Sequence, residues 1–255
     1  MKSNLTVTAL FVSVVAATSS VHAGITQINY ASMTVDGREG FDAFSGASST
    51  VNSDAIYSNN GMSFGKYFSG QQLAVETGSV SGTTNYWDRL DGSASGPLTL
   101  MAGAANKNLG FIGFPGYGGV ISTGGPVGGT TGGVGPGGFG SGSIAVMFDA
   151  DVAACGLTII GQNVGTANFS FFRRDGSLIG STSIVLTGIP IGYAPPETLG
   201  FQSDTGASEI AGFSMWNNDN LGFGMDDFVF GGAAVPAPGA IAVLGVAGFL
   251  GRRRR

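Results

Sequence analysis

Histidine and cysteine are almost absent from this 255-residue chain, which contains one residue of each type. The histidine, His22, lies in an N-terminal segment that we expect to be cleaved off. Histidine is the usual general base and the commonest metal ligand, so Ser-His-Asp catalysis, Cys-His catalysis and His-ligated zinc are excluded for the remaining chain. Cys155 stands alone in an apolar stretch and cannot form an intramolecular disulfide, so we expect a buried thiol.

Charge is also scarce, because charged residues make up only 11% of the chain and the formal net charge is −5. Five of the eleven basic residues lie in the two end segments, whereas all sixteen acidic residues lie between them, which gives the central region a net charge of −10. Nucleic-acid binding needs clustered lysine and arginine, so this class is excluded. Hydrophobic residues at 43% are sufficient for a core. A strongly acidic domain of this kind suits divalent-cation binding.

The first 23 residues have the pattern of a secretory signal peptide. Lys2 gives a short positive start, and residues 5–17 form an apolar run of the expected length. The small residue Ala23 precedes the expected cleavage site, which leaves Gly24 as the first mature residue. The pattern therefore predicts an exported protein.

The last 21 residues, 235–255, combine three features in order. A proline-containing motif is followed by the uncharged apolar segment 239–251 and by four terminal arginines. A 13-residue helix spans about 20 Å, which is short of the roughly 30 Å hydrocarbon core, so we expect a weak, transient anchor whose arginines stay cytoplasmic. The motif and cluster residues are Val235, Pro236, Ala237, Pro238, Gly239, Arg252, Arg253, Arg254 and Arg255.

This tail resembles the PEP-CTERM sorting signal of exported bacterial proteins. It differs from the usual motif in one position, where Ala237 replaces a glutamate. The resemblance implies that exosortase, a membrane-embedded processing enzyme, removes the tail, after which the protein reaches the cell surface or the extracellular matrix. The alternatives are an ordinary C-terminal anchor or a coincidental apolar tail.

The region 24–234 is rich in short runs of β-branched and aromatic residues separated by turn residues. We predict an all-β fold, a single antiparallel β-sandwich of jelly-roll type, with a hairpin turn at Asp175-Gly176. The predicted strands are 25–35, 62–68, 72–76, 143–149, 157–160, 167–173, 178–186, 199–202, 209–217 and 223–230.

Glycine dominates one internal segment, residues 110–142, where 16 of 33 residues are glycine. Ordering such a segment costs much backbone entropy, so we expect a long loop. Its G-x-G-x-x-G match at 135–140 lacks a strand-turn-helix frame, which excludes a dinucleotide site.

The strongest candidate for a metal site is the last predicted strand, which contains Asp226 and Asp227. Strand alternation places these two carboxylates on opposite faces, so one of them points into apolar surroundings and needs a cation or hydrogen-bond donors. Together with nearby Asp219, their oxygens suit calcium. The alternatives are a carboxylate bonded to backbone amides or one that is merely solvated. Further ligands could come from three acidic residues near the start of the domain, Asp36, Glu39 and Asp42.

Trp87 and Trp216 each neighbour polar side chains and are candidates for stacking on a sugar, although a tryptophan in such a glycine-rich sandwich more often fills the core. We therefore expect a non-catalytic cell-surface or extracellular-matrix protein that is structural, adhesive or associated with polysaccharide. The alternatives are a secreted carbohydrate-active enzyme that uses two carboxylates and an ice- or surface-binding protein, although the threonines form no repeating Thr-x-Thr ladder.

Overall fold

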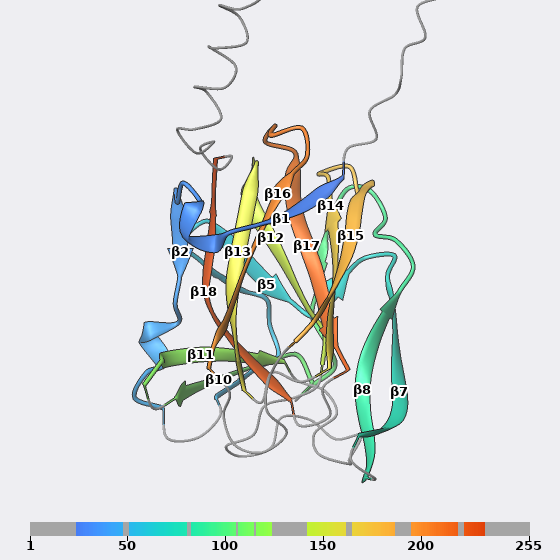
Figure 1. Cartoon of the computed structure of the whole chain (residues 1–255). Coiled ribbons are helices and arrows are strands. Elements are labelled where there is room, and N and C mark those ends of the chain that lie inside the picture. Colours follow the sequence, from blue (N-terminus) through green and yellow to red (C-terminus); the bar gives the residue numbers. More distant parts are fainter. Residues whose placement is uncertain are drawn as a thin grey trace, which may run out of the picture.

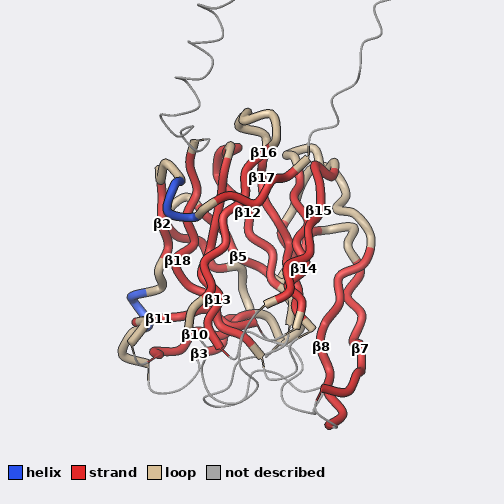
Figure 2. The backbone as a smooth tube through the Cα atoms, viewed as in Figure 1, coloured by secondary structure: helices blue, strands red, loops and turns tan. Residues whose placement is uncertain are grey.

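The computed structural model describes residues 24–47, 51–80, 83–105, 107–114, 116–123, 142–161, 165–186, 195–218 and 222–232. Within these ranges the chain forms antiparallel β-strands and two short 3-10 turns, η1 (Tyr30–Ser32) and η2 (Asp42–Phe44) (Figures 1 and 2). The prediction of an all-β fold with antiparallel sheets is confirmed. No helix in the described ranges is both long and apolar enough to cross a membrane.

The larger sheet, here called sheet A, has eight strands. Seven of them lie in the order β1-β16-β13-β18-β11-β10-β3, and β2 pairs with β18 beside β11. The strands are β1 (Ile25–Ile28), β2 (Gly37–Glu39), β3 (Val51–Ser53), β10 (Leu109–Phe114), β11 (Gly118–Thr123), β13 (Ala154–Gly161), β16 (Glu197–Ser203) and β18 (Phe223–Gly231).

The second sheet, sheet B, has six strands in the order β15-β14-β17-β12-β5-β4. The hairpin predicted at Asp175-Gly176 is confirmed, because it joins β14 to β15 and Gly176 adopts the left-handed φ of 84° that the turn requires. The strands are β4 (Tyr57–Asn59), β5 (Met62–Gly65), β12 (Ile144–Val152), β14 (Thr166–Phe172), β15 (Leu178–Val185) and β17 (Ile210–Asn217).

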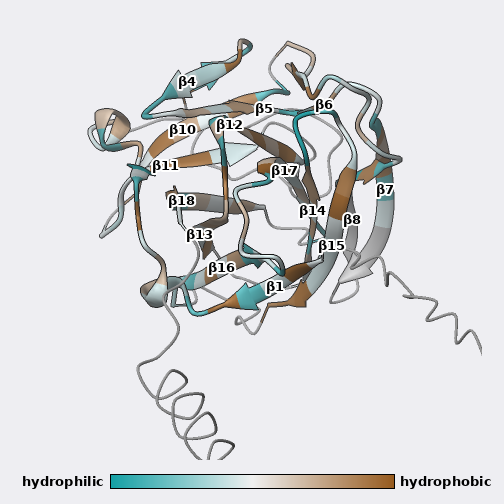
Figure 3. Cartoon of the chain, turned by 90° about the horizontal axis from the view of Figure 1, so that it is seen from above, coloured by the Kyte–Doolittle hydropathy of each residue, from teal (hydrophilic) through white to brown (hydrophobic). Residues whose placement is uncertain are grey.

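Two strand pairs lie outside the main sheets. One is β6 (Tyr67–Phe68) with β9 (Leu100–Met101), and the other is the long hairpin of β7 (Gln72–Val80) and β8 (Thr83–Asp91). The hairpin lies alongside sheet B near β17 (Figures 1 and 3).

The main core lies between sheets A and B and is built largely from phenylalanine. Phe228 of β18 packs edge-on against Phe64 of β5, with ring centroids 5.1 Å apart, and Phe201 of β16 lies 4.7 Å from Phe169 of β14. Cys155 is buried in this core, as predicted, and burial raises the pKa of its thiol. These contacts join strands that are far apart in sequence into one sandwich-like body.

The expectation of a loop across residues 110–142 is wrong for its first part, because β10 and β11 form a hairpin within sheet A. Glycine here permits close packing of backbones rather than disorder. A Cβ atom at Gly119 would lie 1.8 Å from the carbonyl oxygen of Phe41, and one at Gly113 would lie 2.3 Å from that of Ser45. The two strands therefore fit directly beneath the η2 segment. Residues 124–141 lie outside the described ranges.

The first predicted strand, 25–35, is also shorter than expected. β1 ends at Ile28, and the chain turns into η1, where the side chain of Asn29 accepts a hydrogen bond from the backbone N–H of Ala31. The signal-peptide residues 1–23 and the tail residues 235–255, including the motif and the arginine cluster, lie outside the described ranges.

Candidate functional site

A β-bulge in β18 determines where Asp226 and Asp227 lie. Thr158 of β13 pairs with Asp226, whereas Gly156, two residues earlier, pairs with Val229, so β18 has one extra residue at this point. Asp227 occupies the left-handed region with φ of 50°, which is uncommon for a residue with a side chain.

Because of this bulge, the predicted strict alternation of faces along the last strand is wrong. Met225 and Phe228, three residues apart, both belong to the core between the sheets. Under strict alternation these two side chains would point to opposite faces, so the extra residue restores Phe228 to the core. Neither aspartate therefore belongs to that core, and both line a pocket on sheet A instead.

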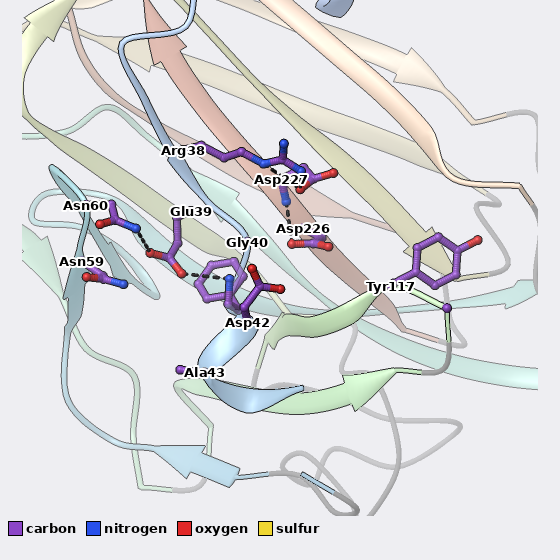
Figure 4. A pocket seen from close by; sticks show the side chains of 12 residues that line it. Arg38, Glu39, Gly40, Asp42, Ala43, Asn59, Asn60, Tyr117, Asp226 and Asp227 are labelled. Carbon is purple, nitrogen blue, oxygen red and sulfur yellow. Dashed lines mark hydrogen bonds and ion pairs between the residues drawn. The ribbon is translucent and has the colours of Figure 1, made fainter. Parts of the chain in front are cut away.

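The same two residues lie where β18 changes its neighbour. β11 pairs with Gly224 and Met225, and β2 pairs with residues 228–230 on the same side of the strand. No described strand pairs with Asp226 or Asp227 on that side. The sheet is therefore open at the two aspartates, and the segments that leave β2 and enter β11 surround the opening (Figure 4).

Asp226 is nearly buried, with 5% exposure, and forms no ion pair with any described residue. Its Oδ1 accepts a hydrogen bond of 2.7 Å from the backbone N–H of Asp227. Burial raises the pKa of Asp226 to about 7, and the negative charges of Asp227 and Asp42 add to the effect. The Thr158 hydroxyl oxygen, across the strand pair, is buried without a hydrogen-bond partner, so this neighbour does not stabilise the Asp226 carboxylate.

Asp227 differs from its neighbour because it is partly exposed and forms an ion pair with Arg38 of β2. Its backbone carbonyl accepts a hydrogen bond of 2.8 Å from the Tyr30 hydroxyl. Burial raises the pKa of Tyr30 to about 12, with a further contribution from the charge of Asp227. η1 is thus tied to the bulge.

Glu39 has a structural part in the site. This side chain is 3% exposed, and its two carboxylate oxygens accept hydrogen bonds from the backbone N–H of Phe41, at 2.8 Å, and from the side-chain amide of Asn60, at 3.1 Å. Phe41 and Asn60 both have a φ of 49°, so Glu39 holds two left-handed residues in place. Phe41 in turn inserts its ring into the core, 5.3 Å from Phe64.

Three carboxylate oxygens converge around Gly40. A Cβ atom built on this glycine would lie 3.6 Å from Asp226 Oδ1, 3.7 Å from Asp227 Oδ1 and 3.8 Å from Asp42 Oδ2. A Cβ atom at Gly118, the first residue of β11, would lie 3.1 Å from Asp42 Oδ1. The missing side chains at both glycines leave space in front of the carboxylates.

The pocket has a volume of about 440 Å³. Besides the acidic residues, Asn59, Asn60 and Tyr117 contribute to its lining (Figure 4). Of the residues expected from sequence, Asp226, Asp227, Glu39 and Asp42 meet here, whereas Asp36 does not line the pocket and Asp219 lies outside the described ranges.

The carboxylates form an open arrangement. Among the described residues, no group of three or more histidine, cysteine, aspartate or glutamate side chains is arranged to enclose a metal ion as it stands. A hard cation such as calcium fits the donor chemistry, since aspartate oxygens and asparagine carbonyls are its preferred ligands. It would be held by few protein oxygens at a time, with water completing its coordination.

The two tryptophans proposed as sugar platforms do not line the acidic pocket. Trp87 lies in β8 and Trp216 in β17, and both side chains are half-buried.

Sequence reasoning missed a buried ion pair between Lys66 and Asp88, whose side chains are 1% and 4% exposed. The signal was present, because Lys66 is a single charge inside the apolar run 62–68. A lysine there needs a buried partner.

No protein-family model, no curated protein and no solved structure matches this chain.

Proposed function

We propose that this chain is a non-catalytic exported protein of the cell surface or extracellular matrix, with a structural, adhesive or polysaccharide-associated role and a calcium ion bound in the acidic pocket. The observation that carries the calcium proposal is the convergence of Asp226, Asp227 and Asp42 oxygens around Gly40. We also propose that the strands of the sandwich are connected as in a jelly roll.

The uncompensated negative charge in the acidic pocket supports the proposal of a bound cation. Asp226 is nearly buried without an ion pair in the described part of the chain, and two further carboxylates face the same space. A divalent cation would offset this repulsion and the cost of burying the charge. Because the site is open, we expect a dissociation constant of about 10⁻⁴–10⁻³ M, the range of extracellular calcium modules.

Polysaccharide association is supported by the size and lining of the pocket. A volume of about 440 Å³ exceeds what one cation occupies and falls within the range of about 300–1,000 Å³ of small-molecule sites. Asn59, Asn60 and Tyr117 offer hydrogen bonds and an aromatic surface beside the carboxylates. Sugar hydroxyls could complete the coordination of the calcium ion.

Export and sorting are proposed from the two ends of the sequence. Residues 1–23 have signal-peptide character, and residues 235–255 resemble a PEP-CTERM tail. Exosortase and the membrane would then be partners of the tail. N-terminal sequencing of surface-extracted protein should give Gly24, and neutral replacements of Arg252 through Arg255 should change its localisation. Retention of Met1, or unchanged localisation, would contradict this part of the proposal.

A hydrolytic function would use two of the same pocket carboxylates, because four acidic side chains line one pocket. Release of reducing sugar from polysaccharides that does not depend on calcium, and that is lost in Asp226→Asn, would favour hydrolysis over binding.

Calorimetric titration with calcium chloride tests the calcium site. The purified protein should release or absorb heat with a single binding step, and Asp42→Asn should weaken binding by about tenfold or more, since it removes one charged ligand. Asp91→Asn is the matched control, because Asp91 is a surface aspartate paired with Arg89 outside the pocket. Absence of binding, or equal affinity in the Asp42 variant, would refute the site.

A further inference from the structure

Asp204, which directly follows β16, contacts the residues at the start of β1. Its backbone N–H donates to the carbonyl oxygen of Gly24 at 3.0 Å, and its Oδ1 accepts a hydrogen bond from the Thr26 hydroxyl. These contacts extend the pairing of β1 with β16, in which Ile25 lies opposite Ser203. The carboxylate therefore lies on the side of β1 that carries positions 24 and 26.

The second carboxylate oxygen of Asp204, Oδ2, has no hydrogen-bond donor in the described part of the chain, and Asp204 forms no ion pair there. Glu209, which follows the same β16–β17 turn, differs because Arg173 lies 2.6 Å from its Oε2. Asp204 thus keeps a negative charge and an unused acceptor at the surface.

Gly24 leaves space for a nitrogen directly in front of this oxygen. A Cβ atom at Gly24 would collide with Asp204 Oδ2 and lie 3.4 Å from its Cγ, and apart from the chain neighbours no other described residue has an atom within 4 Å of that position. A charge-assisted hydrogen bond of about 2.7–2.9 Å to a carboxylate oxygen places the nitrogen at a similar separation from the carboxylate carbon. The exposed carboxylate can make the small shift that this bond needs, so the position suits a cationic nitrogen.

A terminal glycine can place its own nitrogen there. The nitrogen and the Cβ position rotate together about the Cα–C bond, so a turn of about 120° brings the nitrogen to where the Cβ would stand, and glycine tolerates such backbone rotations. The rotation leaves the Gly24 carbonyl bonded to Asp204. It requires a free nitrogen, because a preceding chain would have to swing with it.

We propose that Asp204 binds the α-ammonium group of Gly24 after the signal peptide has been removed. This inference rests on the proposed cleavage after Ala23. Hydrolysis of the peptide bond between Ala23 and Gly24 takes up one water molecule and gives a carboxylate on Ala23 and an amine on Gly24. The amine is largely protonated at neutral pH. The ammonium group and the Thr26 hydroxyl then occupy both oxygens of Asp204.

The ion pair would fasten an edge of the sandwich. β1 has only four residues and lies at the end of sheet A. It approaches β15 of sheet B, since a Cβ atom at Gly180 would lie 3.3 Å from the nitrogen of Ile25, and Ile25 packs against the main core. Chain ends fray at the lowest free-energy cost, so a contact at Gly24 keeps this edge closed. Removal of the signal peptide thereby stabilises the sandwich.

The reactivity of the α-amine tests the pairing. After residue 23 the other amines are Lys66 and Lys107, so acylation followed by peptide mass spectrometry can measure each amine separately. In the chain from Gly24 to Arg255, the α-amine should have a pKa above its usual value of about 8. Asp204→Asn should raise its acylation rate at pH 7 by about two- to fivefold, the range that an exposed ion pair gives. Unfolding the unmodified chain in urea should raise the rate by a similar factor, which makes the test independent of the folding of a variant.

Asp36→Asn is the matched control, because Asp36 is also exposed and has no atom within 4 Å of the Cβ position at Gly24. Its α-amine should react as in the unmodified chain. An α-amine that reacts equally fast in the folded chain, in urea and in Asp204→Asn would overturn the pairing, and so would an equal increase in both aspartate variants. The N-terminus is set by preparation in this experiment, so a negative result would leave the export proposal intact. N-terminal sequencing of the exported protein tests cleavage separately.

Discussion

Asp227 forms an ion pair with Arg38, whereas the adjacent Asp226 is almost fully buried and forms no ion pair with any described residue. The β-bulge produces this difference, because it turns two consecutive carboxylates toward one pocket instead of opposite faces of the sheet. The pocket therefore holds more negative than positive charge, and this imbalance can be tested in several ways.

Gly40→Ala should block the cation without disturbing the fold. The new methyl group would lie 3.6–3.8 Å from three aspartate oxygens, which is ordinary van der Waals contact but occupies the space in front of them. We expect calcium affinity to fall by about tenfold or more and the melting temperature in EDTA to stay unchanged. Gly46→Ala is the control, since nothing lies within 4 Å of its added carbon. Equal calcium affinity in both variants would place the cation elsewhere.

Arg38→Gln should have opposite effects on stability and on calcium binding. The variant loses the ion pair with Asp227, and because Arg38 is well exposed this should cost at most about 1 kcal/mol of unfolding free energy. Removing a positive charge beside the pocket should tighten calcium binding. Denaturant titration in EDTA and calorimetry with calcium measure the two effects. Weaker calcium binding would show that Arg38 organises the site instead of competing with the cation.

The stability of the metal-free protein should fall as pH rises from about 4 to about 7. The folded-state pKa of Asp226 is about 7, above its ordinary value of 3.8, so between these values the folded protein binds more protons than the unfolded chain. Unfolding free energy then decreases by at most about 1.4 kcal/mol per pH unit from this group and levels off above pH 7.

Two comparisons check that assignment. Asp226→Asn cannot ionise, so its stability in EDTA should lose this pH dependence. Saturating calcium should oppose the decrease in the unmodified protein, because the ion binds the ionised carboxylate. Urea titrations at several pH values measure both. A slope that is the same in the variant would assign the proton uptake to another group.

Gly119→Ala should be strongly destabilising. Its added carbon would lie 1.8 Å from the Phe41 carbonyl oxygen, so β11 and the η2 segment would have to separate at a cost of about 1–3 kcal/mol or more. Thermal unfolding measures the loss, and Gly46→Ala again provides the control. A melting temperature equal to that of the control would mean that β11 does not pack beneath η2.

Much of the sheet structure could be predicted because β-branched and aromatic runs indicate strands locally. The runs near residues 143–149 and 209–217 correspond to β12 and β17, and Asp175-Gly176 forms the expected turn. Of the three acidic residues named from sequence as further ligands, Glu39 and Asp42 line the pocket of Asp226.

The features that sequence reasoning missed depend on distant contacts. Strict alternation could not reveal the bulge at Asp227, because an extra residue is visible only when the pairing with β13 is known. The strands β10 and β11 were not predicted because their sequence is rich in glycine. A glycine that allows another backbone segment to pack closely against it, such as Gly119, cannot be distinguished by local sequence from a glycine in a loop. Lys66 was visible as an isolated charge, but its partner was not.

The junction of β2 and β11 on one side of β18 also affects how the protein matures. Asp42 belongs to the early part of the chain and Asp226 to the last described strand, so the pocket joins the two extremes of the sandwich. A chain synthesised from its N-terminus cannot assemble this pocket until its final strand has emerged. Capture of a cation there would lock the first and last described segments of the sandwich together.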